Sequence, residues 1–253
     1  MRTQNRAVVD VVFLVTILSK LVAGSIDSTV CPSAVLCSCS DVDLLANCSN
    51  RGFSAVPPGL PMDLKSLDMS HNQLRRINST EMFRLSSLED LDLSHNRLKE
   101  FTMSGRQLVH LSLKKLDLSH NRISSVKSLW LTGLERLQDL NLANNQIESL
   151  PSRTLFEVGN GLRRLNLKSN KIVNLDPQCF NDLQVLKELS LTKNKLSSFP
   201  KEVDLPNLEV LELNKNSFVQ IEGLMFNGLP KLKVSNFKKI INCTTSNGYY
   251  LCL

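Results

Sequence analysis

Three of the four histidines in the chain recur at almost equal spacing, and each stands directly before an asparagine. They are His71, His95 and His120. Histidines at a fixed interval could bind a metal ion or form a contact that depends on pH. The interpretation that the spacing favours is plainer: Ser-His-Asn was copied with a duplicated repeat, and each histidine is exposed and unpaired. We therefore expect no metal site and no cofactor.

Asp92, Ser94 and His95 have the residue types of a catalytic triad. A triad needs its three side chains to converge on one reacting group, beside donors for an oxyanion. Neighbours along one strand segment do not converge in this way, and nothing in the sequence resembles a nucleophile elbow. The sequence also lacks a P-loop, a dinucleotide-binding fingerprint and an HExxH motif. We expect no enzymatic activity and no catalytic residue.

The elements that position these residues come from one repeated pattern, LxxLxLxxNxL, which occurs seven times between Leu64 and Phe218. Leucines two positions apart share one face of a short strand, and stacked coils bury that face together. The pattern and its period of about 24 residues predict an α/β-type leucine-rich-repeat solenoid. In it, a curved parallel sheet forms the concave face, and the convex side is irregular or short-helical.

Each repeat ends its strand segment with an asparagine whose amide both donates and accepts hydrogen bonds. One amide can therefore satisfy buried backbone groups of its own coil and of the next coil. We interpret these residues as structural: Asn72, Asn96, Asn121, Asn145, Asn170, Asn194 and Asn216.

The concave face is the predicted binding surface, and three columns of side chains cross it. The start column is Ser66, Asp90, Lys115, Asp139, Arg164, Glu188 and Val210. The end column is Asp68, Asp92, Asp117, Asn141, Asn166, Ser190 and Glu212. The turn column is His71, His95, His120, Asn144, Ser169, Lys193 and Lys215. The columns predict a face that begins acidic and becomes basic. Its candidate binding residues are Asp68, Asp90, Asp92, His95, Asp117, His120, Asp139, Arg164, Lys193 and Glu212.

Residues 1–25 read as a secretory signal peptide, because Arg2 and Arg6 precede the apolar run 11–18 and small residues 23–25 follow. No later segment is apolar enough to span a membrane. We expect a secreted chain with an N-terminal cysteine-rich cap over 26–61, seven repeats over 62–230, and a degenerate eighth repeat with an atypical tail over 231–253.

Four cysteines lie close together: Cys31, Cys37, Cys39 and Cys48. In an exported chain this cluster indicates disulfides, and zinc is disfavoured because C-x2-C pairs and a nearby histidine are lacking. Four cysteines allow three pairings. Of the other three cysteines, Cys243 and Cys252 could pair and Cys179 is expected to be a buried thiol.

Sequons at Asn78 and Asn242 are the candidate glycosylation sites, and Asn78 is the better one because it lies in a predicted convex loop. The net charge of +6 raises the question of a polyanion partner such as heparan sulfate. Basic residues are scattered along the sequence, however, so solvated surface charge is the default interpretation. Export argues against a nucleic-acid partner.

The segment from Cys31 to Pro61, with Cys-Ser-Cys and CSNRGFSAVPPGLP, resembles the N-terminal cap of extracellular leucine-rich-repeat proteins. That resemblance implies disulfides between Cys31 and Cys39 and between Cys37 and Cys48. Leu211–Val234 resembles the repeats of the leucine-rich repeats and immunoglobulin-like domains family. Its members are single-pass membrane proteins that bind growth-factor receptors and tune their signalling. The resemblance implies that this chain corresponds to the first half of such a protein and that longer forms span the membrane once.

The repeat pattern breaks after Val234. Ser235, Phe237 and Ile240 stand where the pattern requires Leu, Leu and Asn. We expect a frayed eighth coil, an exposed core edge on the seventh coil, and self-association through that end.

These features together predict an extracellular protein-binding module that contacts a cell-surface receptor and modulates its signalling. Two alternatives stay open. One is a structural leucine-rich-repeat protein of the extracellular matrix, and the other is an innate-immune ectodomain that recognises microbial ligands.

Overall fold

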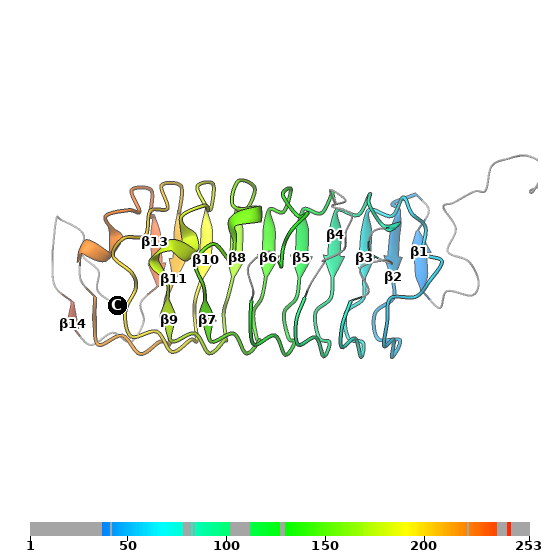
Figure 1. Cartoon of the computed structure of the whole chain (residues 1–253), viewed down its shortest axis with the longest axis horizontal. Coiled ribbons are helices and arrows are strands. Elements are labelled where there is room, and N and C mark those ends of the chain that lie inside the picture. Colours follow the sequence, from blue (N-terminus) through cyan, green and yellow to red (C-terminus); the bar gives the residue numbers. More distant parts are fainter. Residues whose placement is uncertain are drawn as a thin grey trace, which may run out of the picture.

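The computed structural model describes residues 37–40, 42–77, 82, 84–101, 112–126, 130–221, 223–236 and 242–243. Their largest element is a ten-stranded sheet whose strands follow one another along the long axis of the molecule (Figure 1). Its strands, in order, are β1 (Ser38–Ser40), β2 (Leu45–Asn47), β3 (Ser66–Asp68), β4 (Asp90–Asp92), β5 (Lys115–Asp117), β6 (Asp139–Asn141), β8 (Arg164–Asn166), β10 (Glu188–Ser190), β11 (Val210–Glu212) and β13 (Val234–Asn236). β1 pairs with β2 antiparallel, and every later pair is parallel.

Alternation along each repeat strand separates the core from the concave face. The central leucine of β4, Leu91, is buried, whereas Asp90 and Asp92 on either side are half-buried. The same register places Leu91 beside Leu67 and Leu116 of the neighbouring strands. The leucines therefore form one continuous core through the stack, and the residues beside them form the sheet's outer face.

The side opposite the sheet is short and irregular, as predicted. It contains the paired strands β7 (Ser149–Leu150) and β9 (Asn174–Leu175), the paired strands β12 (Gln220–Ile221) and β14 (Asn242–Cys243), and the 3-10 helices η1 (Phe156–Val158), η2 (Pro177–Phe180) and η3 (Gly223–Phe226). Helix η2 begins where Asp176 accepts a hydrogen bond from the backbone nitrogen of Gln178, with proline at its first position. The predicted leucine-rich-repeat solenoid fold is thus confirmed.

The asparagines join adjacent coils. The Asn121 amide nitrogen donates to Leu93 O of the preceding coil at 2.9 Å and to Leu118 O of its own coil at 3.1 Å. Its amide oxygen accepts from the backbone nitrogen of Leu98 at 3.0 Å. The same arrangement recurs at Asn96, Asn145, Asn170, Asn194 and Asn216. The predicted structural role of these residues is confirmed.

The N-terminal cap is joined to the sheet by a disulfide between Cys37 and Cys48, with the Cα atoms 4.5 Å apart. Cys48 is fully buried in the core. Cys39 is also disulfide-bonded, and its expected partner Cys31 lies outside the described residues. The signal peptide over 1–25, the sequon at Asn78 and the expected partner of Cys243, Cys252, also lie outside them. Cys179 is the buried free thiol that was predicted.

The eighth coil corrects the expectation of a frayed end at its strand. β13 pairs in parallel with β11, with Ser235 opposite Leu211. Backbone groups supply the hydrogen bonds of a strand pair, so the ladder extends by one strand although Ser235 replaces the usual leucine. The backbone edge of β11 in the seventh coil is therefore paired, and the expectation of an exposed apolar core edge there stays a prediction. Among the described strands of this sheet, β13 is the last.

Candidate functional site: the groove along the sheet

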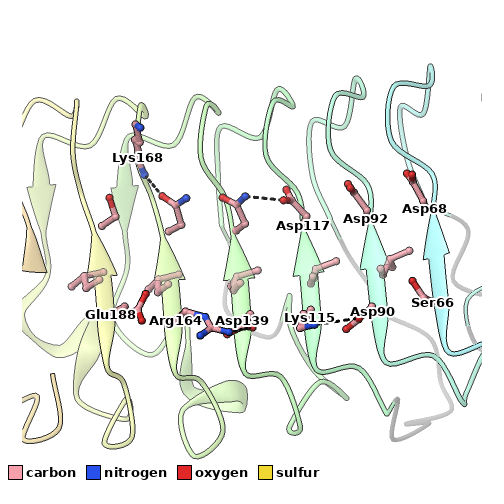
Figure 2. A pocket seen from close by; sticks show the side chains of 18 of the residues that line it. Ser66, Asp68, Asp90, Asp92, Lys115, Asp117, Asp139, Arg164, Lys168 and Glu188 are labelled. Atoms are coloured by element: carbon pink, nitrogen blue, oxygen red, sulfur yellow. Dashed lines mark hydrogen bonds and ion pairs between the residues drawn. The ribbon is translucent and has the colours of Figure 1, made fainter. Parts of the chain in front are cut away.

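A shallow groove of about 600 Å³ runs along the outer face of the sheet from β3 to β11. Figure 2 shows its side chains standing in rows, with Asp68, Asp92 and Asp117 in one row and Ser66, Asp90, Lys115 and Asp139 in another. The start and end columns both line it. It therefore contains Asp68, Asp90, Asp92, Asp117, Asp139, Arg164 and Glu212 of the candidate binding residues.

The end column also shapes the turn that follows each strand. One carboxylate oxygen of Asp92 accepts a 2.8 Å hydrogen bond from the backbone nitrogen of Ser94. Asp68 and Asp117 bind the residue two positions later in the same way. Asn141 and Asn166 make the equivalent bond at 3.1 Å with a neutral amide. The turn therefore requires only a hydrogen-bond acceptor, and the negative charge of the three aspartates is not needed to form it.

Charge in the start column is largely neutralised within the groove. Lys115 lies 3.3 Å from Asp90, and Arg164 lies 2.6 Å from Asp139 (Figure 2). The hydrogen bond that Arg164 donates to Asp139 and the charge of that carboxylate raise the pKa of Arg164. The second carboxylate oxygen of Asp139 is buried and has no hydrogen-bond partner.

The end-column aspartates have no cationic partner among the described residues, and the sheet places them one strand apart. Burial raises the pKa of Asp92, and the neighbouring charges of Asp117 and Asp68 add to that rise, against the lowering effect of the bonds from Ser94. Asp117 accepts one further bond, at 2.8 Å, from the amide of Asn141. This end of the groove is therefore acidic and incompletely compensated.

The turn column does not line the groove, so His95, His120 and Lys193 lie at the turns beside it and their place in a binding surface stays a prediction. All seven residues of the column have left-handed backbone, with φ between 53° and 57°. That conformation ends the strand and turns the following asparagine inward. Lys193 and Lys215, which carry the predicted change from acidic to basic in this column, are not part of the groove lining.

The histidines are exposed as predicted, but the expectation that they are unpaired is wrong. The rings of His71 and His95 stack with centroids 4.1 Å apart, and those of His95 and His120 stack at 3.9 Å. His120 is within 3.1 Å of the side-chain nitrogen of Asn144. Burial, followed by the neighbouring His120 and His71, lowers the pKa of His95. Backbone bonds from each histidine to the next coil hold the rings in line, at 3.1 Å for His71 and 3.0 Å for His95.

Sequence reasoning missed Lys168, which lines the groove. It occupies the position two before the repeat asparagine, where Ser70, Ser94 and Ser119 are buried. A long charged residue at a position otherwise held by small ones was the available signal, since such a side chain must point out of the core.

The arrangement of these side chains does not support a metal site, a catalytic triad or a nucleophilic cysteine among the described residues. Within the described ranges, no group of three or more His, Cys, Asp or Glu side chains could hold a metal ion. Asp92 binds the backbone of Ser94, which is the contact of a turn and not of a catalytic relay. Burial raises the pKa of the Cys179 thiol, so this cysteine is not an activated nucleophile. Of the helices in the described part, none is long and apolar enough to cross a membrane.

The chain matches the family model described as leucine rich repeat over residues 48–98, 112–159 and 160–204. It is 36% identical over 77 residues to the Danio rerio leucine-rich repeat and immunoglobulin-like domain-containing nogo receptor-interacting protein 1-B, covering 30% of this chain and 12% of that protein. It is 37% identical over 67 residues to leucine-rich repeat-containing protein 55 of Mus musculus, covering 25% of this chain and 21% of that protein. The chain thus spans a small part of these curated relatives.

Two solved structures share the fold over most of the chain. Human 5T4, also called Wnt-activated inhibitory factor 1 or trophoblast glycoprotein, aligns with a TM-score of 0.67 and 30% identity over 80% of this chain and 78% of that one. The TLR13–ssRNA13 complex aligns with a TM-score of 0.63 and 28% identity over 75% of this chain and 27% of that one. Proteins of this fold are typically non-enzymatic interaction modules, and the matches support a protein-interaction ectodomain.

Proposed function

Because the chain belongs to the leucine-rich repeat family, we propose that it is an extracellular protein-binding module whose groove contacts a cell-surface receptor. The observation that carries this proposal is the shape of the groove. Its volume of about 600 Å³ would suit a small molecule if it were enclosed. Here it is spread over seven strands about 4.8 Å apart, which makes it roughly 30 Å long. A shallow trough of that length fits a protein surface.

The charge of the groove limits the chemistry of the partner. Asp68, Asp92 and Asp117 are uncompensated, while Lys115 and Arg164 are held by carboxylates. A partner with arginine or lysine side chains opposite the first three repeats would supply the missing charge. The same acidity disfavours nucleic acid in the groove, because phosphates would be repelled.

The extracellular location is supported by the disulfide between Cys37 and Cys48, since such bonds persist in oxidising compartments. Relatives whose names combine leucine-rich repeats with immunoglobulin-like domains and with receptor interaction agree with a role at the cell surface.

The test is binding of the purified chain to a panel of recombinant receptor ectodomains, measured by surface plasmon resonance. The informative variant is Asp92→Asn with Asp117→Asn. Asn141 and Asn166 already fill this column with an intact turn, so the variant keeps the acceptor and loses only the charge. We expect affinity to fall on the order of tenfold, about 1.4 kcal/mol.

The matched control is Glu148→Gln with Asp204→Asn, which removes two exposed carboxylates away from the groove. We expect it to bind as the unchanged chain does. Equal losses of affinity in both variants would mean that binding depends on the net charge of the chain and not on the groove. A partner sensitive only to substitutions on the side opposite the sheet would contradict the proposal.

A further inference from the structure

A second surface, on the strip of chain that follows each repeat asparagine, gathers positive charge. Backbone bonds fix this strip from coil to coil: Arg97 N donates to Leu74 O, and Arg122 N donates to Leu98 O, both at 2.8 Å. Leu74 and Leu98 are buried, whereas the residues on either side of each leucine are exposed. The first and third residues after each asparagine therefore stand side by side on the outside of successive coils.

On the first three repeats these exposed positions hold four cations, Arg75, Arg97, Lys99 and Arg122. Together they line a hollow of about 360 Å³. Among the described residues no other one lines it, and none of the four forms an ion pair or a side-chain hydrogen bond with another described residue. Four cations in one hollow repel each other unless an anion lies among them. The strip changes at the next repeat, where the same two positions are Gln146 and Glu148.

A second basic hollow lies beside Lys114, Arg136, Arg163 and Lys187. Two of those cations are already neutralised, Lys114 by Glu89 at 2.6 Å and Lys187 by Glu209 at 3.7 Å. The hollow of Arg75, Arg97, Lys99 and Arg122 differs in that all four of its cations are without an ion pair among the described residues.

We propose that Arg75, Arg97, Lys99 and Arg122 form a binding site for a sulfated polysaccharide chain. Three of the four are arginines, whose planar guanidinium groups bind sulfate and phosphate oxygens in pairs. The cations extend over three coils, roughly 10 Å at about 4.8 Å per coil, which suits a chain carrying repeated anions better than a single ion. The site rests on the proposed extracellular location, where such chains occur, but it uses a surface separate from the groove.

The probe is heparin, with unsulfated heparosan as the comparison, and affinity is measured by surface plasmon resonance at several salt concentrations. The test variant replaces all four cations with glutamine. The matched control replaces the exposed residues Arg136, Arg163, Lys193 and Lys215 with glutamine, which removes the same number of positive charges away from this strip. Melting temperatures establish that both variants fold.

We expect the test variant to lose at least tenfold in heparin affinity and the control to change by less than about twofold, since exposed charges far from a site are screened. Replacing the three arginines with lysine should cost part of the affinity while the charge stays constant. Three outcomes would overturn the site: equal losses in both four-residue variants, heparosan binding as well as heparin, or polyglutamate or single-stranded RNA binding as tightly.

The same measurement separates this site from the groove. Asp92→Asn with Asp117→Asn should leave heparin binding intact or slightly stronger, because it removes negative charge. The four-glutamine variant should keep its affinity for a receptor that binds through the groove. The two proposals can therefore fail independently, because each variant is expected to change the binding of only one ligand.

Discussion

The imidazole rings of His95 and His120 stack face to face, with centroids 3.9 Å apart and planes inclined by 10°. His71 stacks on the other side of His95, so the middle ring has a histidine on each face. Two neighbouring rings cannot both become charged without repulsion at this distance. The two neighbouring rings therefore disfavour the charged form of His95, whose pKa is lowered by burial first and then by His120 and His71.

The first prediction is that removing its neighbours raises the pKa of His95. Burial is the largest cause of its lowered pKa, and His120 and His71 follow. The variant His71→Ala with His120→Ala removes both rings and exposes the third to water. NMR titration of the imidazole should show the pKa of His95 moving upward relative to the unchanged chain. An unchanged value would mean that the neighbouring rings do not affect its protonation, and a lower value would mean that they favour its charged form.

The sign of the accompanying stability change follows. A histidine whose pKa is lower in the folded state contributes stability that is present above its unfolded value, about 6.5, and is lost as pH falls through the folded value. The free energy of unfolding should thus decrease below about pH 6.5, more in the unchanged chain than in the double variant. Solvent screens this exposed group, so the difference should be small.

The second prediction concerns the asparagine ladder. Asn121→Ala would leave Leu98 N without its partner inside the core, and Leu93 O would keep only the bond from Asn96. Each unpaired buried group costs about 1–3 kcal/mol. Asn216→Ala breaks the equivalent bonds to Leu196 and Leu191, but Asn216 is only half-buried.

Chemical denaturation should therefore show a larger loss of unfolding free energy for Asn121→Ala than for Asn216→Ala, because water can replace the lost partners at the more exposed site. Equal losses in the two variants would indicate that burial does not set the cost.

The third prediction concerns the N-terminal cap. Cys48→Ser breaks the bond to Cys37 and places a hydroxyl at a fully buried position. Loss of a native disulfide typically costs about 2–5 kcal/mol, so the melting temperature should fall clearly. Cys179→Ala is the control, because its thiol is free. Reducing agent should lower the melting temperature of the Cys179→Ala control as much as it lowers that of the unchanged chain. Melting that is insensitive to both Cys48→Ser and reductant would contradict this role.

The sequence was sufficient for the parts of the fold that depend on side-chain pattern. The spacing of Leu91 and Leu93 specified the strand and its inward face, and the amide of Asn96 specified the coil-to-coil bonds. The eighth strand was not predictable in this way, because β13 is held by backbone groups that are the same in every residue. The backbone of Ser235 pairs with Leu211 although the repeat pattern requires leucine at that position.

The two surfaces outside the groove could not be predicted without knowing how the coils stack on one another. His95 and Asp92 are close in sequence, but the left-handed backbone at His95 places it beyond the groove's lining. Arg75 and Arg122 are far apart in sequence, and only stacking of three coils brings their side chains to one hollow. Basic residues that are scattered along the sequence of a solenoid can thus lie together in space. Their scatter along the sequence is why the sequence alone favoured solvated surface charge over a polyanion site.

The last prediction is self-association through the end of the sheet marked by β13. Its pairing with β11 is formed, and on its other side no strand of the described ranges is paired with it. An unpaired strand edge offers backbone donors and acceptors to another chain. We expect light scattering to show a dimer or larger species at micromolar concentration.

Hydrogen exchange locates the contact. Protection of the amides of residues 234–236 should increase with protein concentration, whereas that of residues 139–141 in β6, which is paired on both sides, should not change. If chains associate through this edge, protection of its amides from exchange rises with the fraction of associated chains. The amides of an internal strand are protected equally at every concentration. A monomer whose protection at 234–236 is strong and independent of concentration would show that this end is already covered within one chain.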